Sequence, residues 1–567
     1  MKKLICLLIA LICTMSFVAC TPSSGNNENV NDDGTEKSIL KVAIIDSGYG
    51  TAFAEEMEKD FEAYHANTEF EEGKRGVNVE LVPGLEEYSR STLINKIKDY
   101  ETTLYICEPS YADFVAQDLM VDLSDLVREK IYDKDGNLAK DTGLEPMYCM
   151  EDLFYEGFSE FNRKVDGKCY GVPYAGSVGG VIYDADLFHR EALFFDKNGK
   201  VGANYDDIES GNCSTGPDGI KGTFDDGMPN TIKDFGTLMS EMVKVGVTPF
   251  CFSGKYTYTR NCAFEQIHCS YEGADNYRLN FTFDGYDTGL GKQITEANYK
   301  DLLYQNGRKA GIRFFEEISK NSKYYTQNSI AASDHTGAQL EFIYSVETNN
   351  PIAMFCEGGW WESESRTVFE DMSAISEDYA YGKRNFRLFP IPQFTGDAWV
   401  PEQTNKTMTI NTNIAYGSNM FLSKYNASEN PEVAVEIGKE FLRFVNQREQ
   451  IIKFTKNTGG CVRALKVPTD YTEEEMSMLT KYGRSIYEYI NDGAVLFWDV
   501  VTADKRYYNF QAFGGGDGGW SFACSTVGGT FFNEPLNAFL SKIGDRHPTH
   551  DEVFAGMVSE TLRSFAP

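Results

Sequence analysis

The sequence has only one long apolar run, and this limits where the chain can meet a membrane. After the N-terminal segment no stretch approaches the roughly 18 uninterrupted apolar residues that a membrane-spanning helix needs. The single run, Leu4 to Val18, follows the basic residues Lys2 and Lys3. A basic start followed by a short apolar segment is typical of a secretory signal peptide. We therefore expect an exported protein.

Positive charge is scarce. The chain has 53 Lys and Arg against 85 Asp and Glu, which gives a formal net charge of −32. Nucleic acids and anionic membrane surfaces are polyanions, so this balance argues against both as ligands. A neutral or cationic solute is easier to reconcile with it.

Motifs for metal binding and nucleophilic catalysis are also missing. The sequence contains no C-x-x-C, H-E-x-x-H, G-x-S-x-G or Walker-type loop. Of the 13 cysteines, several lie inside apolar strands, where we expect buried free thiols. Nothing in these patterns points to an enzyme or to a required cofactor.

The end of the apolar run, Phe17-Val18-Ala19-Cys20, resembles a bacterial lipobox, although Leu is commoner where Phe17 stands. The resemblance implies that residues 1–20 are a lipoprotein signal peptide and that Cys20 is lipidated. The alternative is an ordinary secretory signal with a chance cysteine. Residues 21–37 are rich in Asn, Ser, Gly and acids, which predicts a disordered tether. We expect the protein on the extracellular face of the cell membrane, held there by lipid only.

After the tether, apolar strands alternate with amphipathic helices. Strands are predicted at 39–45, 77–82 and 103–107, with helices at 52–64 and 88–100 between them. Such alternation with short links indicates βαβ units and a parallel sheet. The fold class is therefore α/β.

The segment 351–362 combines an apolar strand, Ile352 to Phe355, with a glycine pair and two adjacent tryptophans, Trp360 and Trp361. Open α/β sheets present ligand-binding groups where a strand ends. An aromatic face suits the apolar face of a sugar ring, and the neighbouring Glu357 and Glu362 suit its hydroxyl groups. The alternative is that both tryptophans are core residues beside a tight turn. Because side chains on an extended segment alternate, we expect only one of them to face a ligand.

Several short motifs resemble those of bacterial extracellular solute-binding proteins, family 1, which serve carbohydrate ABC importers. The motifs are Gly167–Ser177, Gly179–Phe188, Pro229–Phe235, Gly246–Phe250, Ile352–Trp361, Phe389–Pro392, Asn419–Ser423 and Glu432–Asn446. Asp184 departs from the family pattern, in which Asn is commoner. The resemblance covers about residues 39–465 and rests on the order of the motifs.

The resemblance implies a two-lobed periplasmic-binding-protein-like fold of type II, with crossing strands around a ligand cleft. The first lobe is predicted at 38–168 and 330–412. The second is predicted at 169–329 and 413–567, with an Asp/Gly-rich insertion at 195–230. The crossings are expected near 165–172, 325–350 and 405–418.

The same resemblance implies a monomeric receptor that delivers a carbohydrate to ABC permease subunits. The predicted ligand-binding residues are Trp360, Trp361, Glu357 and Glu362 on the first-lobe side, Tyr174, Ser177 and Tyr256 on the second, and Tyr49, Trp498 and Trp520. Two alternatives stay open. One is a secreted glycoside hydrolase, which needs a pair of nearby carboxylates. The other is a binding protein for a non-sugar solute such as a peptide.

The loop 218–227 carries Asp218, Asp225 and Asp226 among three glycines, and Asp206 and Asp207 lie just before it. Carboxylate and carbonyl oxygens on a tightly curved loop suit calcium. A structural Ca²⁺ is therefore possible, outside the proposed cleft. The alternative is a solvated turn, since Asp-Gly is also a favoured hairpin dipeptide.

Overall fold

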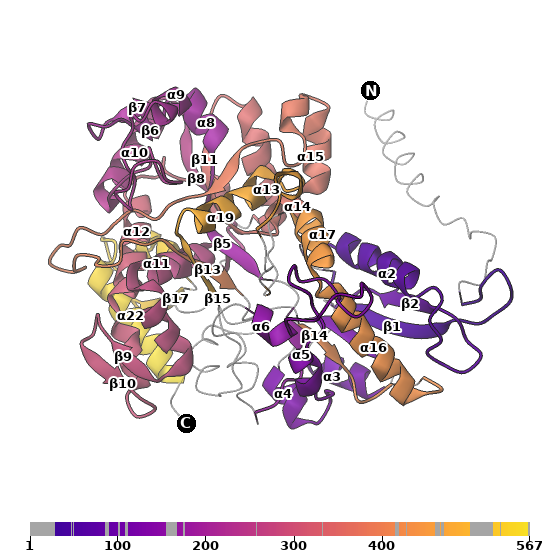
Figure 1. Ribbon diagram of the computed structural model, residues 1–567. Coiled ribbons are helices and arrows are strands. Elements are labelled where there is room, and N and C mark those ends of the chain that lie inside the picture. The colour runs from indigo at the N-terminus through magenta and orange to yellow at the C-terminus, as the bar shows by residue number, and fades with distance from the viewer. Residues whose placement is uncertain are drawn as a thin grey trace, which may run out of the picture.

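The two largest sheets of the computed structural model lie side by side, each with its own helices (Figure 1). The structure describes residues 29–46, 48, 50–85, 90–99, 102–107, 111–154, 167–173, 176–256, 258–331, 333–413, 419–426, 428–459, 465, 470–498, 525–532 and 534–564. The α/β class and the two-lobed architecture are as predicted.

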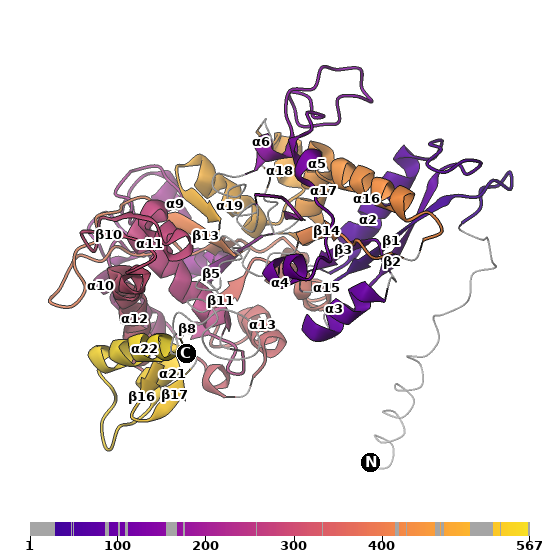
Figure 2. The same ribbon diagram turned by 90° about the horizontal axis from the view of Figure 1, so that it is seen from below.

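The first sheet has the strand order β2-β1-β3-β14-β4. Its strands are β2 (Val77–Val82), β1 (Ser38–Ile44), β3 (Leu104–Cys107), β14 (Asn419–Leu422) and β4 (Val172–Pro173). The pairs β1–β2 and β1–β3 are parallel, which confirms the predicted βαβ units, whereas β14 is antiparallel to β3. Apolar residues of one face pack with α2 (Ala52–Tyr64), α16 (Pro431–Val445) and α17 (Arg448–Thr458). The other face packs with α3 (Arg90–Lys98) and α4 (Tyr111–Ala116), as Figure 2 shows from below.

The second sheet has the order β15-β13-β5-β11-β8, with β12 beside β5. Its strands are β15 (Val495–Trp498), β13 (Thr409–Asn413), β5 (Ser177–Asp184), β11 (Ile352–Gly358), β8 (Thr248–Cys251) and β12 (Phe386–Leu388). One apolar cluster joins it to α10 (Ile232–Lys244), α11 (Tyr258–Thr282) and α12 (Asn306–Ser319). A second cluster joins it to α13 (His335–Tyr344), α15 (Arg366–Ser373) and α19 (Lys481–Asn491).

Shorter elements connect these layers. They are α5 (Ser124–Arg128), α6 (Met150–Leu153), α8 (Ala185–Arg190), β6 (Phe194–Phe195), β7 (Val201–Ala203), α9 (Tyr205–Glu209), β9 (Gly285–Asp287), β10 (Lys292–Ile294), η2 (Tyr299–Tyr304), η3 (Gln327–Ile330), η4 (Ser345–Glu347), α14 (Trp361–Glu364), η5 (Glu377–Tyr379) and α18 (Glu473–Ser477).

The strand pairing corrects the predicted division into lobes. β11 pairs with β5 and β8, and β13 pairs with β5 and β15, so the strands of 330–412 belong to the second lobe. Conversely β14, α16 and α17 pack in the first lobe, whereas the sequence predicts 413–567 in the second. The physical reason is that any apolar strand can complete either sheet. The sequence pattern identifies β11 as a buried strand but does not identify its neighbours.

The positions at which the chain crosses between the two lobes also differ in part from the predicted ones. The chain crosses between β4 and β5, and again between β13 and β14, near the first and third predicted positions. The predicted crossing at 325–350 is wrong for the described part of that segment, because α13 packs against the second lobe. The third crossing lies instead between α17 and α19.

Part of the predicted tether is ordered. Val30 and Glu36 form a β-bridge, and Asn31 Nδ2 donates to the carbonyl of Arg75 at 2.8 Å. An ion pair of 2.6 Å joins Arg75 to Asp33. The prediction of disorder across 21–37 is therefore wrong for the described residues 29–37. Cys20 and the remainder of the tether lie outside the described residues.

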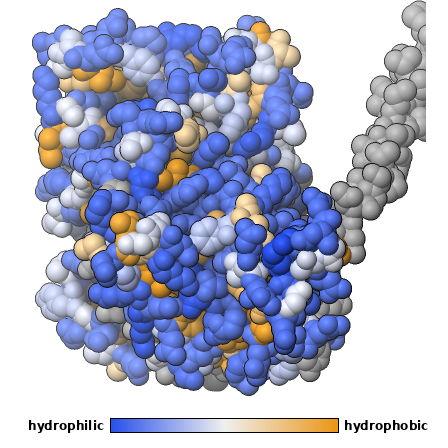
Figure 3. Space-filling model, turned by 45° about the vertical axis from the view of Figure 1, so that its right-hand side comes forward, coloured by the Kyte–Doolittle hydropathy of each residue, from blue (hydrophilic) through white to orange (hydrophobic). Residues whose placement is uncertain are grey.

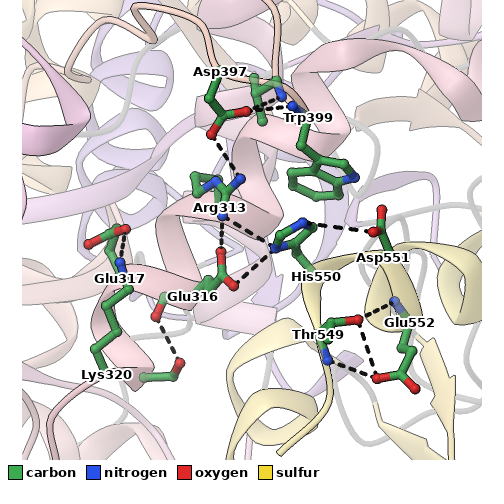
Figure 4. A network of polar contacts seen from close by, with 12 residues as sticks. Arg313, Glu316, Glu317, Lys320, Asp397, Trp399, Thr549, His550, Asp551 and Glu552 are labelled. Atoms are coloured by element: carbon green, nitrogen blue, oxygen red, sulfur yellow. Dashed lines mark hydrogen bonds and ion pairs between the residues drawn. The ribbon is translucent and has the colours of Figure 1, made fainter.

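The C-terminal elements are attached to the second lobe. They are β16 (Ser525–Val527), β17 (Thr530–Phe532), α21 (Pro535–Leu540) and α22 (His550–Ser564). Figure 4 shows the contact between α22 and α12, where His550 Nδ1 lies 3.1 Å from Glu316 Oε1. Arg313 pairs with Glu316 and, at 2.9 Å, with Asp397, while its guanidinium lies 5.1 Å from the centre of the Trp399 ring. This network fixes the C-terminal helix to the lobe.

Two expectations concern the chain as a whole. Among the described residues, no helix is both long and apolar enough to cross a membrane. Eight cysteines of the described part are buried thiols, as predicted: Cys107, Cys149, Cys169, Cys213, Cys251, Cys262, Cys269 and Cys356.

Candidate ligand site between the lobes

The carboxyl ends of the parallel strands lie at the edge of each sheet where the chain crosses between lobes. In the second sheet Gly358, at the end of β11, is opposite Gly179, near the start of β5. Asn413, at the end of β13, is opposite Ser177. In the first sheet Cys107, at the end of β3, is opposite Asn419, at the start of β14. Ligands of open α/β sheets bind beyond such strand ends, so this region is the candidate site.

Most predicted site residues fall on this edge. The pairing places Trp498 opposite Thr412, beside the strand that begins at Ser177, and Tyr256 follows the end of β8. The side chains of Ser177 and Trp498 lie outside the described part of the chain, as do all of Tyr49, Tyr174 and Trp520. Their contact with ligand stays a prediction.

Trp360 bridges the two lobes. It follows β11 of the second sheet, yet its half-buried side chain packs against the apolar cluster of the first lobe. A Cβ atom added at Gly48, beyond the end of β1, would lie 2.6 Å from Trp360 Cδ1. The indole therefore rests on the backbone of the opposite lobe and is only half-buried.

Trp361 is a core residue, and its prediction as a ligand contact is corrected. Its side chain is fully buried and its ring lies 4.9 Å from that of Phe386 and 5.9 Å from that of Phe355. The chain turns into α14 at this residue, and the turn directs the two adjacent indoles to different environments. The core interpretation is thus right for Trp361, whereas Trp360 is only half-buried and its contact with ligand stays a prediction.

Glu357 and Glu362 are also buried, so in this conformation neither carboxyl group is exposed to a ligand. Burial raises the pKa of Glu357 well above its usual range and that of Glu362 to about 8. One oxygen of Glu357 and both oxygens of Glu362 lack a hydrogen-bond partner. Their prediction as sugar ligands is corrected, because both are buried acids.

A polar group at the same edge was not anticipated from the sequence. His335, the first residue of α13, lies 3.3 Å from Glu364, and Gln339 donates to that carboxylate at 2.5 Å. The His335 ring contacts the Tyr256 ring edge-on at 5.3 Å. The hydrogen bond to Glu364 raises the pKa of His335. The only sequence signal was the cap residue Asp334 before the helix, which indicates a helix start rather than a site.

Two surface cavities lined by described residues lie away from this edge. One of about 790 Å³ adjoins β1, β2 and α16 of the first lobe, and one of about 530 Å³ lies between α10 and α12 of the second. Neither is lined by Trp360 or Tyr256. The face drawn in Figure 3 is mostly hydrophilic, with small apolar patches. We place the candidate site by the strand ends, because part of the surrounding chain is outside the described residues.

The acidic loop brings together only some of the predicted calcium ligands. Asp225 is buried, and burial raises its pKa to about 7, with Asp218 nearby. One oxygen of Asp226 is buried and has no hydrogen-bond partner. Asp207 instead caps α9, where its carboxylate accepts from Asn204 N at 3.1 Å, and Asp206 lies in that same first turn.

In the part of the chain that the structure describes, no three His, Cys, Asp or Glu side chains are grouped to hold a metal. The calcium site stays a prediction, restricted to Asp218, Asp225, Asp226 and the carbonyl oxygens of their loop.

Solved structures share this fold over nearly the whole chain. A raffinose complex of the solute-binding protein RafE, known from Streptococcus pneumoniae, is 14% identical with a TM-score of 0.52, over 93% of this chain and 100% of that one. A chitin oligosaccharide binding protein is 15% identical with a TM-score of 0.50, over 94% and 100%.

A structure from a study of xylan utilisation by Caldanaerobius polysaccharolyticus is 13% identical with a TM-score of 0.51, over 93% and 98%. No protein-family model and no curated protein matches the sequence. At such low identities the likeness concerns the fold, and this chain has the two-lobed fold of solute-binding proteins.

Proposed function

We propose that this protein is a lipid-anchored extracellular receptor that binds a carbohydrate between its lobes and delivers it to an ABC permease. The single observation that carries the proposal is the position of Trp360. This half-buried indole stands where strand ends of both lobes meet, and it contacts the lobe opposite its own. An aromatic ring between two lobes suits the apolar face of a sugar.

Three further observations support the proposal. The solved structures with this fold include a raffinose complex and a chitin oligosaccharide binding protein. Tyr256 and the His335–Glu364 pair supply polar groups on the same edge, which can orient hydroxyl groups. The net charge of −32 disfavours an anionic ligand.

A binding protein needs no nucleophile or proton donor, and we propose that this chain is not an enzyme. The glycoside hydrolase alternative requires two carboxyl groups about 5–10 Å apart around the scissile bond. The two carboxyl groups predicted for this site, Glu357 and Glu362, are buried. Their burial favours a structural role.

Calorimetric titration of the mature protein against neutral oligosaccharides, amino sugars and short peptides tests the proposal, with product analysis after incubation. We expect at least one oligosaccharide to bind and to be recovered intact. Turnover of a bound glycan would support the hydrolase instead. Binding of peptides alone would support the non-sugar alternative.

The anchor and the permease have separate tests. Cys20→Ala should abolish labelling by a radioactive fatty acid and release the protein from membranes. Co-purification from the native membrane should recover permease subunits only with the anchored form. If Cys20→Ala stays bound to the membrane, the proposed anchor is contradicted.

A further inference from the structure

The surroundings of the Trp360 ring suggest how the two lobes are coupled. The indole lies between two glycines that come from different lobes. A Cβ atom at Gly48 would lie 2.6 Å from Cδ1 and 3.0 Å from Cγ, in the five-membered ring. A Cβ atom at Gly358 would overlap the six-membered ring at Cη2, Cζ3 and Cζ2. Each glycine is therefore covered by a different part of one indole.

Neither position needs glycine for its backbone conformation. Gly48 and Gly358 are not among the glycines with positive φ, which alone favour glycine for conformational reasons. What both positions require is the absence of a side chain, so that the indole can approach the backbone. This makes a substitution at Gly48 a steric test of the ring's position.

The contact has a mechanical consequence because its two sides belong to different lobes. Gly358 ends β11 of the second sheet, whereas Gly48 follows β1 of the first. When the lobes separate, the indole must leave Gly48 and the apolar cluster of the first lobe, and this exposes apolar surface to water. The seated ring therefore favours the closed arrangement.

We propose that Gly48 and Gly358 are positioning residues that seat the Trp360 indole, and that this ring couples ligand binding to the angle between the lobes. The part of the inference that concerns ligand rests on the proposed function. The part that concerns the interlobe angle does not.

A double-mutant cycle tests the coupling. Gly48→Ala should displace the indole and weaken oligosaccharide binding at least tenfold. The same substitution in a Trp360→Ala background should change affinity less than twofold, since the ring it displaces is gone. An equal effect of Gly48→Ala in both backgrounds, or no effect in the wild type, would overturn the proposal.

A second readout needs no ligand. Val82 in the first lobe and Val245 in the second are both exposed and can each carry a spin label. Double electron–electron resonance between the two labels measures the distance between the lobes. We expect Gly48→Ala and Trp360→Ala each to shift the distance distribution to longer values, and the double variant to shift it no further than Trp360→Ala does. An unchanged distribution in all three variants would overturn the proposal.

Gly236→Ala is the matched control. Gly236 lies within α10 of the second lobe, where an added Cβ would meet only a Glu317 carboxylate oxygen at 3.2 Å. This variant should leave both the affinity and the distance unchanged. If the wild type binds no oligosaccharide, the proposed function fails, while the distance measurement still decides whether the ring is seated as inferred.

Discussion

At the scale of single residues, two neighbouring tryptophans have different roles. Trp361 is enclosed by aromatic rings of the second lobe's core, whereas Trp360 reaches the first lobe and stays partly exposed. The difference comes from the turn between β11 and α14, which places consecutive side chains on different sides. Because both residues are tryptophan, the residue type alone does not predict which one is buried in the core.

Alanine substitutions at the two positions should therefore have opposite effects. Trp360→Ala should weaken oligosaccharide binding by about 2–4 kcal/mol, as removal of an aromatic anchor does, while the melting temperature changes little. Trp361→Ala should cost about 3–5 kcal/mol of stability, because it leaves a large core cavity. Calorimetric titration and chemical denaturation measure the two quantities. A steep loss of stability in Trp360→Ala with affinity retained would show that Trp360 is core.

The buried Glu362 should make stability depend on pH. Burial raises its pKa from 4.5 to about 8, so the folded protein keeps a proton that the unfolded chain releases. Stability should therefore fall as pH rises from about 4.5 to about 8, by up to about 1.4 kcal/mol per pH unit.

Glu362→Gln should remove this contribution, and denaturation at pH 5 and pH 8 would measure it. The exposed Glu474→Gln is the control and should keep the wild-type slope. An unchanged slope in Glu362→Gln would mean that this carboxyl group ionises normally in the folded protein.

At the scale of elements, the second lobe is held together by contacts distant in sequence. Asp184 caps α8 by accepting from Leu187 N at 3.1 Å, and it also forms a buried ion pair with Arg384. Arg384 in turn donates to the carbonyl of Ile343 at 2.9 Å. The residue that departs from the family pattern thus joins β5, α13 and the approach to β12.

The acidic loop near α9 gives a prediction at the same scale. Asp225 is buried close to Asp218, and an oxygen of Asp226 lacks a partner, so a cation there would offset the repulsion between these carboxylates. We expect a chelator to lower the melting temperature of the wild type and added calcium to restore it. Asp225→Asn should lose the response to calcium, and Asp206→Asn should keep it, because Asp206 belongs to the α9 cap turn. If neither the chelator nor calcium changes the melting temperature of the wild type, the calcium prediction is contradicted.

At the scale of the whole molecule, the described residues form two sheets, and we expect their lobes to rotate about the segments that connect them. Ligand bound between them would touch both, so binding should stabilise the closed arrangement. The seated Trp360 ring would contribute to the same arrangement.

A bound oligosaccharide should therefore reduce the radius of gyration measured by small-angle X-ray scattering. It should also stabilise the fold by about 2.7 kcal/mol at a ligand concentration of 100 times the Kd. A non-binding sugar is the control and should change neither quantity. Stabilisation without any compaction would mean that the ligand binds one lobe only.

The sequence determined the elements themselves. Alternating apolar strands and amphipathic helices predicted the α/β class, and the parallel strands β1, β2 and β3 follow from local periodicity. The glycine pair after β11 and the two tryptophans beyond it predicted a strand end near a ligand site. These features are local, and local patterns of polarity and backbone freedom are enough to specify them.

Only the tertiary structure decided which sheet each strand joins and which tryptophan faces the other lobe. The predicted lobe boundaries place β11 in the first lobe, but it pairs with β5 and β8 of the second. The buried positions of Glu357 and Glu362 and the seating of Trp360 on Gly48 likewise depend on segments far apart in the chain. Strand pairing and burial are properties of packing between distant segments, and a strand's own residues carry too little information to select its partners.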